Sequence, residues 1–456
     1  MYFDPIMTLN RYAHGMVDKD KQKAIPRSRL GRLSSMARMA GGVAAGMLGE
    51  GVRQLSEGNR PKVSDLILTP ANARRVAKQL ATMRGAAMKV GQLLSMETND
   101  ILPAELSAIL AQLRERAFIM PRSQLDAALV DAFGEHGIAI FAEFDFTPIA
   151  AASIGQVHRA RTHDGKQIAL KVQYPGVAES IDSDVDNIAT LLRVSNLLPK
   201  HMEIGSLLED AKKQLHEEAD YEKEACHLIS FHQALSHSSD FVVPKFHPEY
   251  SSEKVLAMDY IAGEPIEELL DLSLDERDQL VSNLFKLMLR ELFEFRLMQT
   301  DPNFGNYRYQ RDSKKIVLLD FGATRKFSVN FVVDYKRLLR AVRANEDAAI
   351  VSAADLLGYG ASSASSQYQR LLVDIFGIAL EPFAHVGPYD FANAKISERL
   401  RQMSEGAYAQ KEFWQTPPTD ILYLHRKLGG MYLLATKLEA RVNCQQLVEP
   451  WLQRLR

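Results

Sequence analysis

The sequence predicts an α+β fold of two lobes, in which a small lobe rich in strands precedes a mainly helical large lobe. Two observations predict it. A strand pattern at Gln167–Val172 carries Lys171 in the segment Ile-Ala-Leu-Lys. Further on, Asp301 precedes Asn306 by five positions, and an apolar run then leads to a D-F-G segment that begins at Asp320. This combination is typical of the protein-kinase-like fold, in which a strand lysine, a D-x-x-x-x-N loop and a D-F-G converge on a nucleotide.

Length and composition fit an ordinary globular protein of two or three domains. The chain has 456 residues, of which 46% are apolar and 25% charged. Its net charge of −2 gives no overall positive potential that would attract nucleic acid. Its two cysteines make no disulfide framework, and no apolar run reaches the roughly 18 residues of a membrane-spanning helix. Four segments are expected: a basic and Gly/Ala-rich extension (1–70), a helical extension (71–135), a small lobe (136–261) and a large lobe (262–456).

The N-terminal segment has an excess of positive charge. Residues 1–40 contain eight Lys or Arg and three Asp, and a short Gly/Ala-rich run follows at 39–49. Two interpretations stay open: a solvated tail followed by a tightly packed helix of small residues, or an interfacial segment attracted to anionic lipid. Asp4 comes early and no apolar core of a signal peptide follows it.

Three helices are expected in the second segment. Apolar residues recur at helical spacing from Thr69 to Leu94, and a second helix starts at Leu102 with a proline in its first turn. A third helix is expected from about Arg122 to Phe133. The first helix carries Lys89-Val90-Gly91-Gln92 near its end. On the residues alone, this is an exposed lysine and glutamine beside a glycine packing contact.

The small lobe begins with strands near Phe144. Ala150–His158 joins two of them, and Asp164-Gly165 is the turn of a hairpin whose return strand is Gln167–Val172. Alternation along that strand puts Lys171 on the face opposite to three apolar residues. A lysine in such a strand is usually solvated, but in a kinase-like fold it offsets the charge of the α- and β-phosphates.

An acidic cluster follows an expected insertion. Residues 172–216 show helical patterns, and this segment is longer than the corresponding part of a plain kinase small lobe. Glu218, Asp220 and Glu224 then offer a carboxylate that could hold the lysine in place. The alternative is that these residues are simply a charged helix face.

Two further strands are expected before the large lobe, at Val242–Pro244 and Val255–Tyr260. The second strand would lead into the hinge between the lobes. Backbone groups around Met258 and Tyr260 are therefore candidates for contacting adenine.

The large lobe carries the groups for chemistry. Leu280–Phe295 is expected to be a buried helix that leads into the loop of Asp301. Phosphoryl transfer needs an acceptor-only carboxylate beside the attacking oxygen, and it needs oxygen ligands for magnesium, for which Asn306 and Asp320 are the candidates. After Asp320 the chain enters a helix by about Ser328, which leaves no room for the activation loop and A-P-E segment that seat a peptide in protein kinases. On that ground we argue against a protein substrate.

The rest of the large lobe is expected to be helical, with apolar residues at helical spacing in each segment. Pro417-Pro418 breaks the chain before the penultimate helix, and no internal repeats are present. The expected helices are Val332–Asn345, Asp347–Leu357, Gln367–Leu380, Ile396–Met403, Ile421–Leu438 and a last segment near Gln445–Arg456.

Four further motifs carry a resemblance to a known family. Lys89–Gln92 is similar to a K-x-G-Q signature, Ala150–His158 to an alanine-rich loop, Glu218–Asp220 to an E-x-D motif, and Leu424–Cys444 to a C-terminal helix region. With the lysine strand and the D-F-G, they resemble the UbiB/ADCK family of atypical kinase-like proteins, in particular its mitochondrial-type branch, which supports ubiquinone (coenzyme Q) biosynthesis. The resemblance spans roughly Arg27 to the C-terminus and implies an N-terminal helical extension on a two-lobed kinase-like fold.

The resemblance implies a role for each matching residue. Lys171 would contact the α/β-phosphates and pair with Glu224, while the N-terminal extension would cover the place where a peptide substrate would bind. The residues implied for catalysis are Asp301, Lys171, Glu224, Lys89 and Gln92. Those implied for binding ATP or ADP are Ala151, Ala152, Ser153, Gly155, Lys171, Met258, Tyr260, Glu218 and Asp220. Asn306 and Asp320 would hold Mg²⁺.

The alanine-rich loop has a physical consequence in this comparison. Glycines let backbone N–H groups approach phosphates closely, whereas alanines restrict that approach. The family is thought to favour ADP and suppress protein-kinase activity in this way. The chain departs from the family pattern at Leu113-Arg114-Glu115 (for L-Q-D), at Phe118-Ile119-Met120 (for P-P-M) and at His227 (for a usual asparagine).

We therefore expect a kinase-like ATPase that binds Mg-ATP or Mg-ADP and supports ubiquinone biosynthesis at a membrane surface. Two alternatives stay open: a kinase for a small molecule or lipid, and a non-catalytic, nucleotide-gated scaffold. Expected partners are ubiquinone-biosynthesis enzymes and polyprenyl quinone precursors or anionic lipid, with peripheral membrane contact, no nucleic acid, and a homodimer as a further arrangement to test. The short N-terminus favours a protein of the bacterial cytoplasm, peripheral to the inner membrane; in a eukaryote the place would be the matrix face of the inner mitochondrial membrane.

Overall fold

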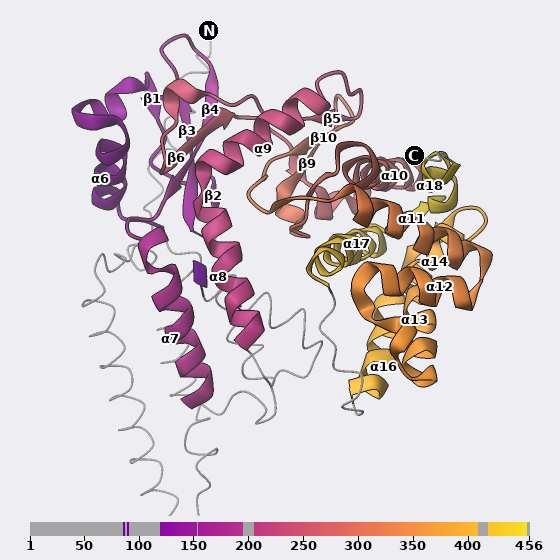
Figure 1. The fold of residues 1–456 in the computed structure, drawn as a ribbon. Helices are drawn as coiled ribbons and strands as arrows, with labels where there is room; N and C mark the ends of the chain where they lie inside the picture. The colour runs from indigo at the N-terminus through magenta and orange to yellow at the C-terminus, as the bar shows by residue number, and fades with distance from the viewer. Residues whose placement is uncertain are drawn as a thin grey trace, which may run out of the picture. The chain divides into compact units, whose positions relative to one another are not determined.

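The computed structural model describes residues 85–86, 89–90, 119–152, 154–194, 205–408 and 418–453. These residues form two units (Figure 1). The first consists of the described residues up to Glu222 together with Phe246–Tyr260, and the second of Lys223–Lys245 together with the described residues from Ile261 onward. Residues 223–245, expected in the small lobe, thus group with the second unit. Within the described ranges, every helix is too short or too polar to cross a bilayer.

The first unit is built on an antiparallel sheet of five strands. Its order is β1-β3-β4-β6, and β2 pairs with the end of β3 that β1 leaves open. The expected turn between β3 and β4 contains Gly165, whose φ of 86° is a left-handed conformation that glycine adopts without steric cost. The strands are β1 (Glu143–Phe144), β2 (Ala150–Ala151), β3 (Gly155–Arg161), β4 (Gln167–Gln173) and β6 (Val255–Asp259).

Helix α6 (Arg122–Phe133) covers one face of this sheet and has the bounds that the sequence predicts. Ile168, Leu170 and Val172 of β4 are fully buried in one core with residues of α6, so these three residues share one face of the strand, as predicted. Lys171, on the other face, is also buried. Two further helices, α7 (Ile181–Val194) and α8 (Gly205–Ala219), lie side by side and form the expected insertion (Figure 1). The chain passes from the first unit into the second within α9 (Tyr221–Ala234).

A buried polar relay joins β3 to the segment before α6. Gln156 Oε1 accepts a hydrogen bond from the Met120 N–H at 3.0 Å, and Gln156 Nε2 lies 2.8 Å from His158 Nε2. His158 Nδ1 lies 2.9 Å from the carbonyl oxygen of Asp145. A carbonyl only accepts, so His158 donates from Nδ1 and accepts from Gln156 at Nε2. Burial lowers the pKa of His158, which agrees with this neutral form. The relay holds Met120 against the sheet.

Two small sheets in the second unit frame the loop of Asp301. β9 pairs antiparallel with β10 and β7, while β10 pairs in parallel with β5. β11 pairs with β8, so the residues after the D-F-G segment return beside the strand that precedes the loop. A separate pair joins β12 to β13. The strands are β5 (Phe241–Val242), β7 (Glu264–Pro265), β8 (Leu297–Gln299), β9 (Tyr307–Gln310), β10 (Lys315–Leu318), β11 (Thr324–Lys326), β12 (Tyr389–Asp390) and β13 (Arg441–Val442).

Helices make up most of the second unit. Ser273 and Glu276 form a capping box at the start of α10, and the Ser328 side chain caps α11 where the sequence predicts a new helix. A π-helical turn, Glu291–Phe295, directly follows α10. The helices are α10 (Leu274–Arg290), α11 (Val329–Ala344), α12 (Asp347–Ala354), α13 (Ser366–Ala379), α14 (Glu381–Ala384), α15 (Phe391–Ala394), α16 (Ile396–Tyr408), α17 (Thr419–Lys437) and α18 (Cys444–Gln453).

Helix α17 packs closely against the loop of Asp301. A Cβ added at Gly430 would lie 2.3 Å from Pro302 Cβ, a distance that real Cβ atoms essentially never show, and 3.1 Å from Pro302 Cα, which is also tight. A Cβ added at Gly429, the preceding residue of the same helix, would meet nothing within 4 Å. Of the two neighbouring glycines, Gly430 is therefore the one that the packing requires.

Gly430→Ala is expected to lower the free energy of unfolding by roughly 1–3 kcal/mol, because the added methyl group overpacks against Pro302. Gly429→Ala is the matched control. It is expected to raise the free energy of unfolding by about 0.5–1 kcal/mol, because alanine favours the helix. Urea unfolding of both variants measures the difference, and equal stabilities would contradict the close contact with Pro302.

Candidate functional site

The β9–β10 hairpin brings Asn306 and Asp320 together. Tyr307 pairs with Leu318 in the register of the hairpin, and the Leu319 N–H donates to the Asn306 carbonyl oxygen at 3.0 Å. Asp320 follows directly. The two side chains predicted to hold magnesium therefore start from neighbouring backbone positions in one unit.

Asp301 is oriented from two sides. Its Oδ2 accepts a hydrogen bond from Asn306 Nδ2 at 3.2 Å, and its Oδ1 lies 3.4 Å from Arg426 Nη2 of α17. The Arg426 side chain is only 7% exposed, against 20% for Asp301, so the carboxylate contacts a buried cation and still reaches solvent. Thr300 ties the loop to the D-F-G segment, because its N–H and its hydroxyl both donate to the Ala323 carbonyl oxygen, at 3.0 and 2.8 Å.

The D-F-G segment packs against α9. A Cβ added at Gly322 would lie 3.4 Å from both Asp320 Oδ1 and Glu224 Oε2, so the two carboxylate oxygens flank one point. Glu224 is almost fully buried. His227, which stands where the resembling family has asparagine, places Nδ1 3.2 Å from the Phe321 carbonyl oxygen. His227 thus makes a polar contact between α9 and the D-F-G backbone.

In the first unit, Lys171 lies over an aromatic ring. Its Nζ is 5.3 Å from the centroid of the Tyr221 ring, within the range of a cation–π interaction. A Cβ added at Gly155 would lie 2.3 Å from the Val172 carbonyl oxygen and 3.1 Å from the Tyr221 hydroxyl. The glycine of the alanine-rich loop is therefore required by packing against β4 and Tyr221, whatever the loop binds.

The alanine-rich loop is closed by its own backbone. The Ala152 N–H donates to the Gly155 carbonyl oxygen at 2.9 Å, and Ala151 pairs with Gln156 in the register of β2 and β3. The Tyr174 N–H donates to the Ile154 carbonyl oxygen at 2.9 Å. The Ala152 amide is thus already bonded within the loop. Ser153, a further predicted nucleotide contact, lies outside the described residues.

Lys89 and Glu218 form a buried ion pair, although they are 129 residues apart in the chain. Lys89 is 1% exposed. The interpretation of Lys89 as an exposed lysine, which the residues alone favoured, is therefore wrong. Asp220 is exposed, and Gln92 lies outside the described residues.

Met258 and Tyr260 lie at the edge of the first unit where the predicted hinge begins. Met258 pairs with Ala169 and also forms an isolated bridge with Phe246, and it is buried. The Tyr260 N–H donates to the Gln167 carbonyl oxygen at 3.0 Å. The sheet therefore already uses the Tyr260 amide, so that amide is not a donor to adenine in this arrangement.

A buried cluster behind the loop of Asp301 was missed from the sequence. Lys427 Nζ donates to Gln299 Oε1 at 3.1 Å and to Tyr307 Oη at 2.6 Å, and it lies 3.8 Å from Glu291 Oε2. All four residues are buried. Burial raises the pKa of Glu291 to about 7; burial opposes the charge of Lys427, but Glu291 and Tyr307 raise its pKa overall. The signal was the pair Arg426-Lys427 inside an apolar helix, because charged residues are rarely buried without partners.

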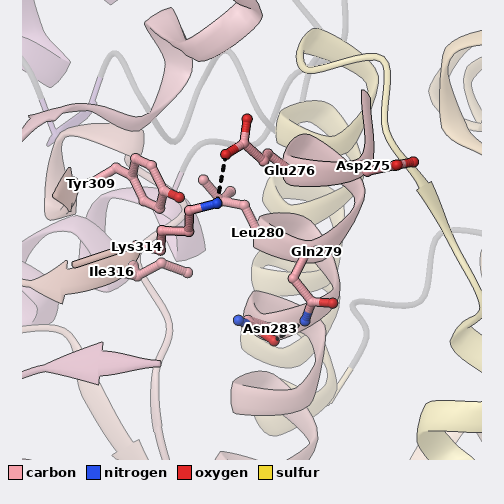
Figure 2. A pocket seen from close by; sticks show the side chains of 8 residues that line it. All are labelled: Asp275, Glu276, Gln279, Leu280, Asn283, Tyr309, Lys314 and Ile316. Atoms are coloured by element: carbon pink, nitrogen blue, oxygen red, sulfur yellow. Dashed lines mark hydrogen bonds and ion pairs between the residues drawn. The ribbon is translucent and has the colours of Figure 1, made fainter. Parts of the chain in front are cut away.

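A small pocket of about 170 Å³ lies elsewhere in the second unit, between α10 and the β9–β10 hairpin (Figure 2). Lys314 and Glu276 form an ion pair of 2.9 Å across it. Its lining residues are Asp275, Glu276, Gln279, Leu280, Asn283, Tyr309, Lys314 and Ile316. It contains none of the predicted site residues, so we assign it no part in the chemistry.

Comparisons with known proteins show the family to which this chain is similar. The sequence pattern of the ABC1 atypical kinase-like domain matches residues 112–354. The chain is 35% identical over 432 residues to "Atypical kinase COQ8, mitochondrial" of Saccharomyces cerevisiae, covering 94% of this chain and 86% of the relative. It is also 35% identical over 434 residues to "Atypical kinase COQ8B, mitochondrial" of Rattus norvegicus, covering 95% of this chain and 82% of the relative.

A solved structure shows the same fold. The complex of Rv3197 with erythromycin from Mycobacterium tuberculosis matches with a TM-score of 0.58 and 24% identity, covering 83% of this chain and 95% of that chain. At that identity the likeness concerns the fold alone. Together with the matched domain, it confirms the predicted kinase-like α+β fold.

Glu291→Gln is expected to remove a pH dependence of stability. Burial raises the pKa of Glu291 from 4.5 to about 7, so the folded chain binds this proton more tightly than the unfolded chain. The stability gained from that proton is complete below the unfolded pKa and is lost as pH rises through the folded pKa. In urea unfolding, the wild type should therefore lose stability relative to the Gln variant between about pH 5 and about pH 8. A constant difference over that range would contradict a titrating Glu291.

Proposed function

From the premise that this chain belongs to the ABC1 atypical kinase-like family, we propose that it is a kinase-like ATPase that binds Mg-ATP or Mg-ADP and supports ubiquinone biosynthesis. The observation that carries the proposal is the grouping of Asp301, Asn306 and Asp320 on one loop and hairpin of the second unit. Relatives named atypical kinase COQ8 and COQ8B support the biosynthetic role.

The donor set fits magnesium. Mg²⁺ is usually held by one or two carboxylates and completes its shell with water and phosphate oxygens. Asp320 offers a carboxylate and Asn306 an amide oxygen from neighbouring backbone positions. Bound there with a nucleotide, the cation would offset charge on the phosphates. Asp301, oriented by Asn306 and Arg426, would accept a hydrogen bond from the attacking oxygen.

Lys171 and Glu224 complete the proposed set of groups. Lys171 would offset the charge of the α/β-phosphates, and its contact with Tyr221 holds a cation on that face of β4. Glu224 would be its carboxylate partner, as in kinase-like folds. Lys89, through its ion pair with Glu218, would anchor the N-terminal extension next to the E-x-D motif.

The connection after Asp320 favours ATP hydrolysis over peptide phosphorylation. Residues 324–326 pair with β8, and α11 begins directly after its cap at Ser328. In protein kinases an activation loop at this place helps to seat the peptide. We therefore propose water or a small molecule as the acceptor of the γ-phosphate. The proposed partners are ubiquinone-biosynthesis enzymes and polyprenyl precursors or anionic lipid.

The proposed site of action is a membrane surface that the chain contacts peripherally. The two relatives named above are mitochondrial proteins, which favours the matrix face of the inner mitochondrial membrane in a eukaryote. In a bacterium, the corresponding place is the cytoplasmic face of the inner membrane. The basic segment 1–40, which lies outside the described residues, is the part proposed to contact anionic lipid.

The fate of the γ-phosphate tests this function. With γ-labelled ATP, magnesium, cardiolipin-containing vesicles and a quinone-precursor mimic, we expect the label to appear as inorganic phosphate. Label in the lipid or in the mimic would instead favour a small-molecule or lipid kinase. Nucleotide binding without turnover would favour a non-catalytic scaffold.

Asp320→Asn is expected to weaken magnesium-dependent ADP binding by on the order of tenfold or more, because an amide is a poorer ligand for a hard cation than a carboxylate. The matched control is Asp312→Asn, in the exposed turn of the same hairpin, which should bind as the wild type does. Calorimetry with and without magnesium measures both. Full magnesium-dependent affinity in the Asp320 variant would refute the assignment.

A further inference from the structure

We propose that Lys427 of α17 is a positioning residue for the catalytic loop, defined as residues 300–306, because it bonds to both ends of that loop. This inference rests on the proposed function for its effect on turnover. Its effect on the order of the loop does not depend on that function.

One ammonium group joins the two strands that flank the loop. Gln299, which accepts from Lys427 Nζ at 3.1 Å, is the last residue of β8. Tyr307, whose hydroxyl lies 2.6 Å from the same nitrogen, is the first residue of β9. The loop with Asp301 and Asn306 runs between these two points. Fixing both ends restricts the positions that the two side chains can take.

The cluster contains the charge that a buried lysine needs. Glu291 Oε2 lies 3.8 Å from Lys427 Nζ, and both side chains are at most 4% exposed. Glu291 belongs to the π-helical turn that follows α10, a local irregularity that often marks functional sites. Replacing a buried ion pair by apolar residues of similar volume is often neutral or stabilising. Stability alone therefore does not account for this arrangement, whereas holding the loop does.

Neighbouring positions of α17 contact the loop between its ends. Arg426 lies 3.4 Å from Asp301 Oδ1, and Gly430 lets the helix approach Pro302 closely. The contacts of Arg426, Lys427 and Gly430 thus fall on Asp301, on both loop ends and on Pro302. A displacement at Lys427 would be passed to Asp301 through the loop backbone and through Arg426 on the same helix.

A paired substitution separates positioning from folding. Lys427→Met alone leaves Glu291 buried without its cation and should lower the melting temperature. Lys427→Met with Glu291→Leu removes both charges and should recover the melting temperature. In this paired variant we expect kcat for ATP hydrolysis to fall roughly 10–100-fold, with a smaller change in KM, because small misplacements of catalytic groups slow the chemical step.

Hydrogen–deuterium exchange reports the loop without any need for turnover. Amides of residues 300–306 should exchange faster in the paired variant, while those in the middle of α10 keep their rates. Tyr307→Phe removes one of the two hydrogen bonds of Lys427 and keeps both charges. The loop amides should therefore also exchange faster in this variant, but by a smaller factor. If the paired variant does not fold, the Tyr307 variant alone tests the positioning role.

The outcomes are distinguishable. Wild-type kcat and wild-type exchange in a folded paired variant, or in Tyr307→Phe, would overturn the positioning role. A wild-type protein that binds ADP but never hydrolyses ATP would instead overturn the proposed ATPase function. In that case the exchange rates alone would support or overturn the role of Lys427.

Discussion

The candidate site depends on one constraint, the register of β9 on β10. Because Tyr307 lies opposite Leu318, the next pair outward joins the Asn306 carbonyl to the Leu319 N–H, and Asp320 follows at once. Side chains alternate with a period of two, so a shift of one residue would turn the buried residues of β10 toward solvent. The parallel pairing of β10 with β5 holds the register from the other side. Packing of a short apolar strand thus decides where two polar side chains meet.

A buried lysine in each unit connects segments that are distant in the chain. Lys89 pairs with Glu218 in the first unit, and Lys427 lies beside Glu291 in the second. Ion pairs of this kind add little net stability, since removing the charges from water offsets most of their attraction. They are also intolerant of misplacement, because either partner alone would be a buried, uncompensated charge. Both pairs are thus better suited to fixing geometry than to raising stability.

Features of short range were predictable from the sequence. The structure agrees with the expected bounds of α6, the two faces of β4 and the start of α11 at Ser328. For β4 the signal is the alternation of apolar residues, and for α11 it is the capping serine. The spacing of Asp301, Asn306 and Asp320 predicted the kinase-like fold, which the comparisons confirm. The roles of these residues remain proposals.

Contacts of long range were not predictable from one sequence. The sequence suggests an exposed Lys89, because no residue near it in the chain indicates its partner, Glu218, which lies 129 positions away. Lys427 and Glu291 were missed for the same reason, and no local pattern marks the π-helical turn that precedes β8. The contact of Tyr221 with Lys171 was also not predicted. A tyrosine three positions before Glu224 is typical of ordinary helix packing. The role of a buried charged residue can be inferred only when its partners in the fold are known.

The segment after Asp320 helps to hold residues 300–306 in place. Thr300 bonds twice to the Ala323 carbonyl oxygen, and β11 pairs with β8, the strand whose last residue accepts from Lys427. Moving this segment aside to seat a peptide would break the pairing of β8 and thereby loosen one end of the loop that carries Asp301. In protein kinases the corresponding activation loop is ordered or released as a switch. Here the same stretch is a strand paired with β8, so a change in its position would disturb the groups for which we propose a catalytic role. This agrees with our proposal of an acceptor smaller than a peptide.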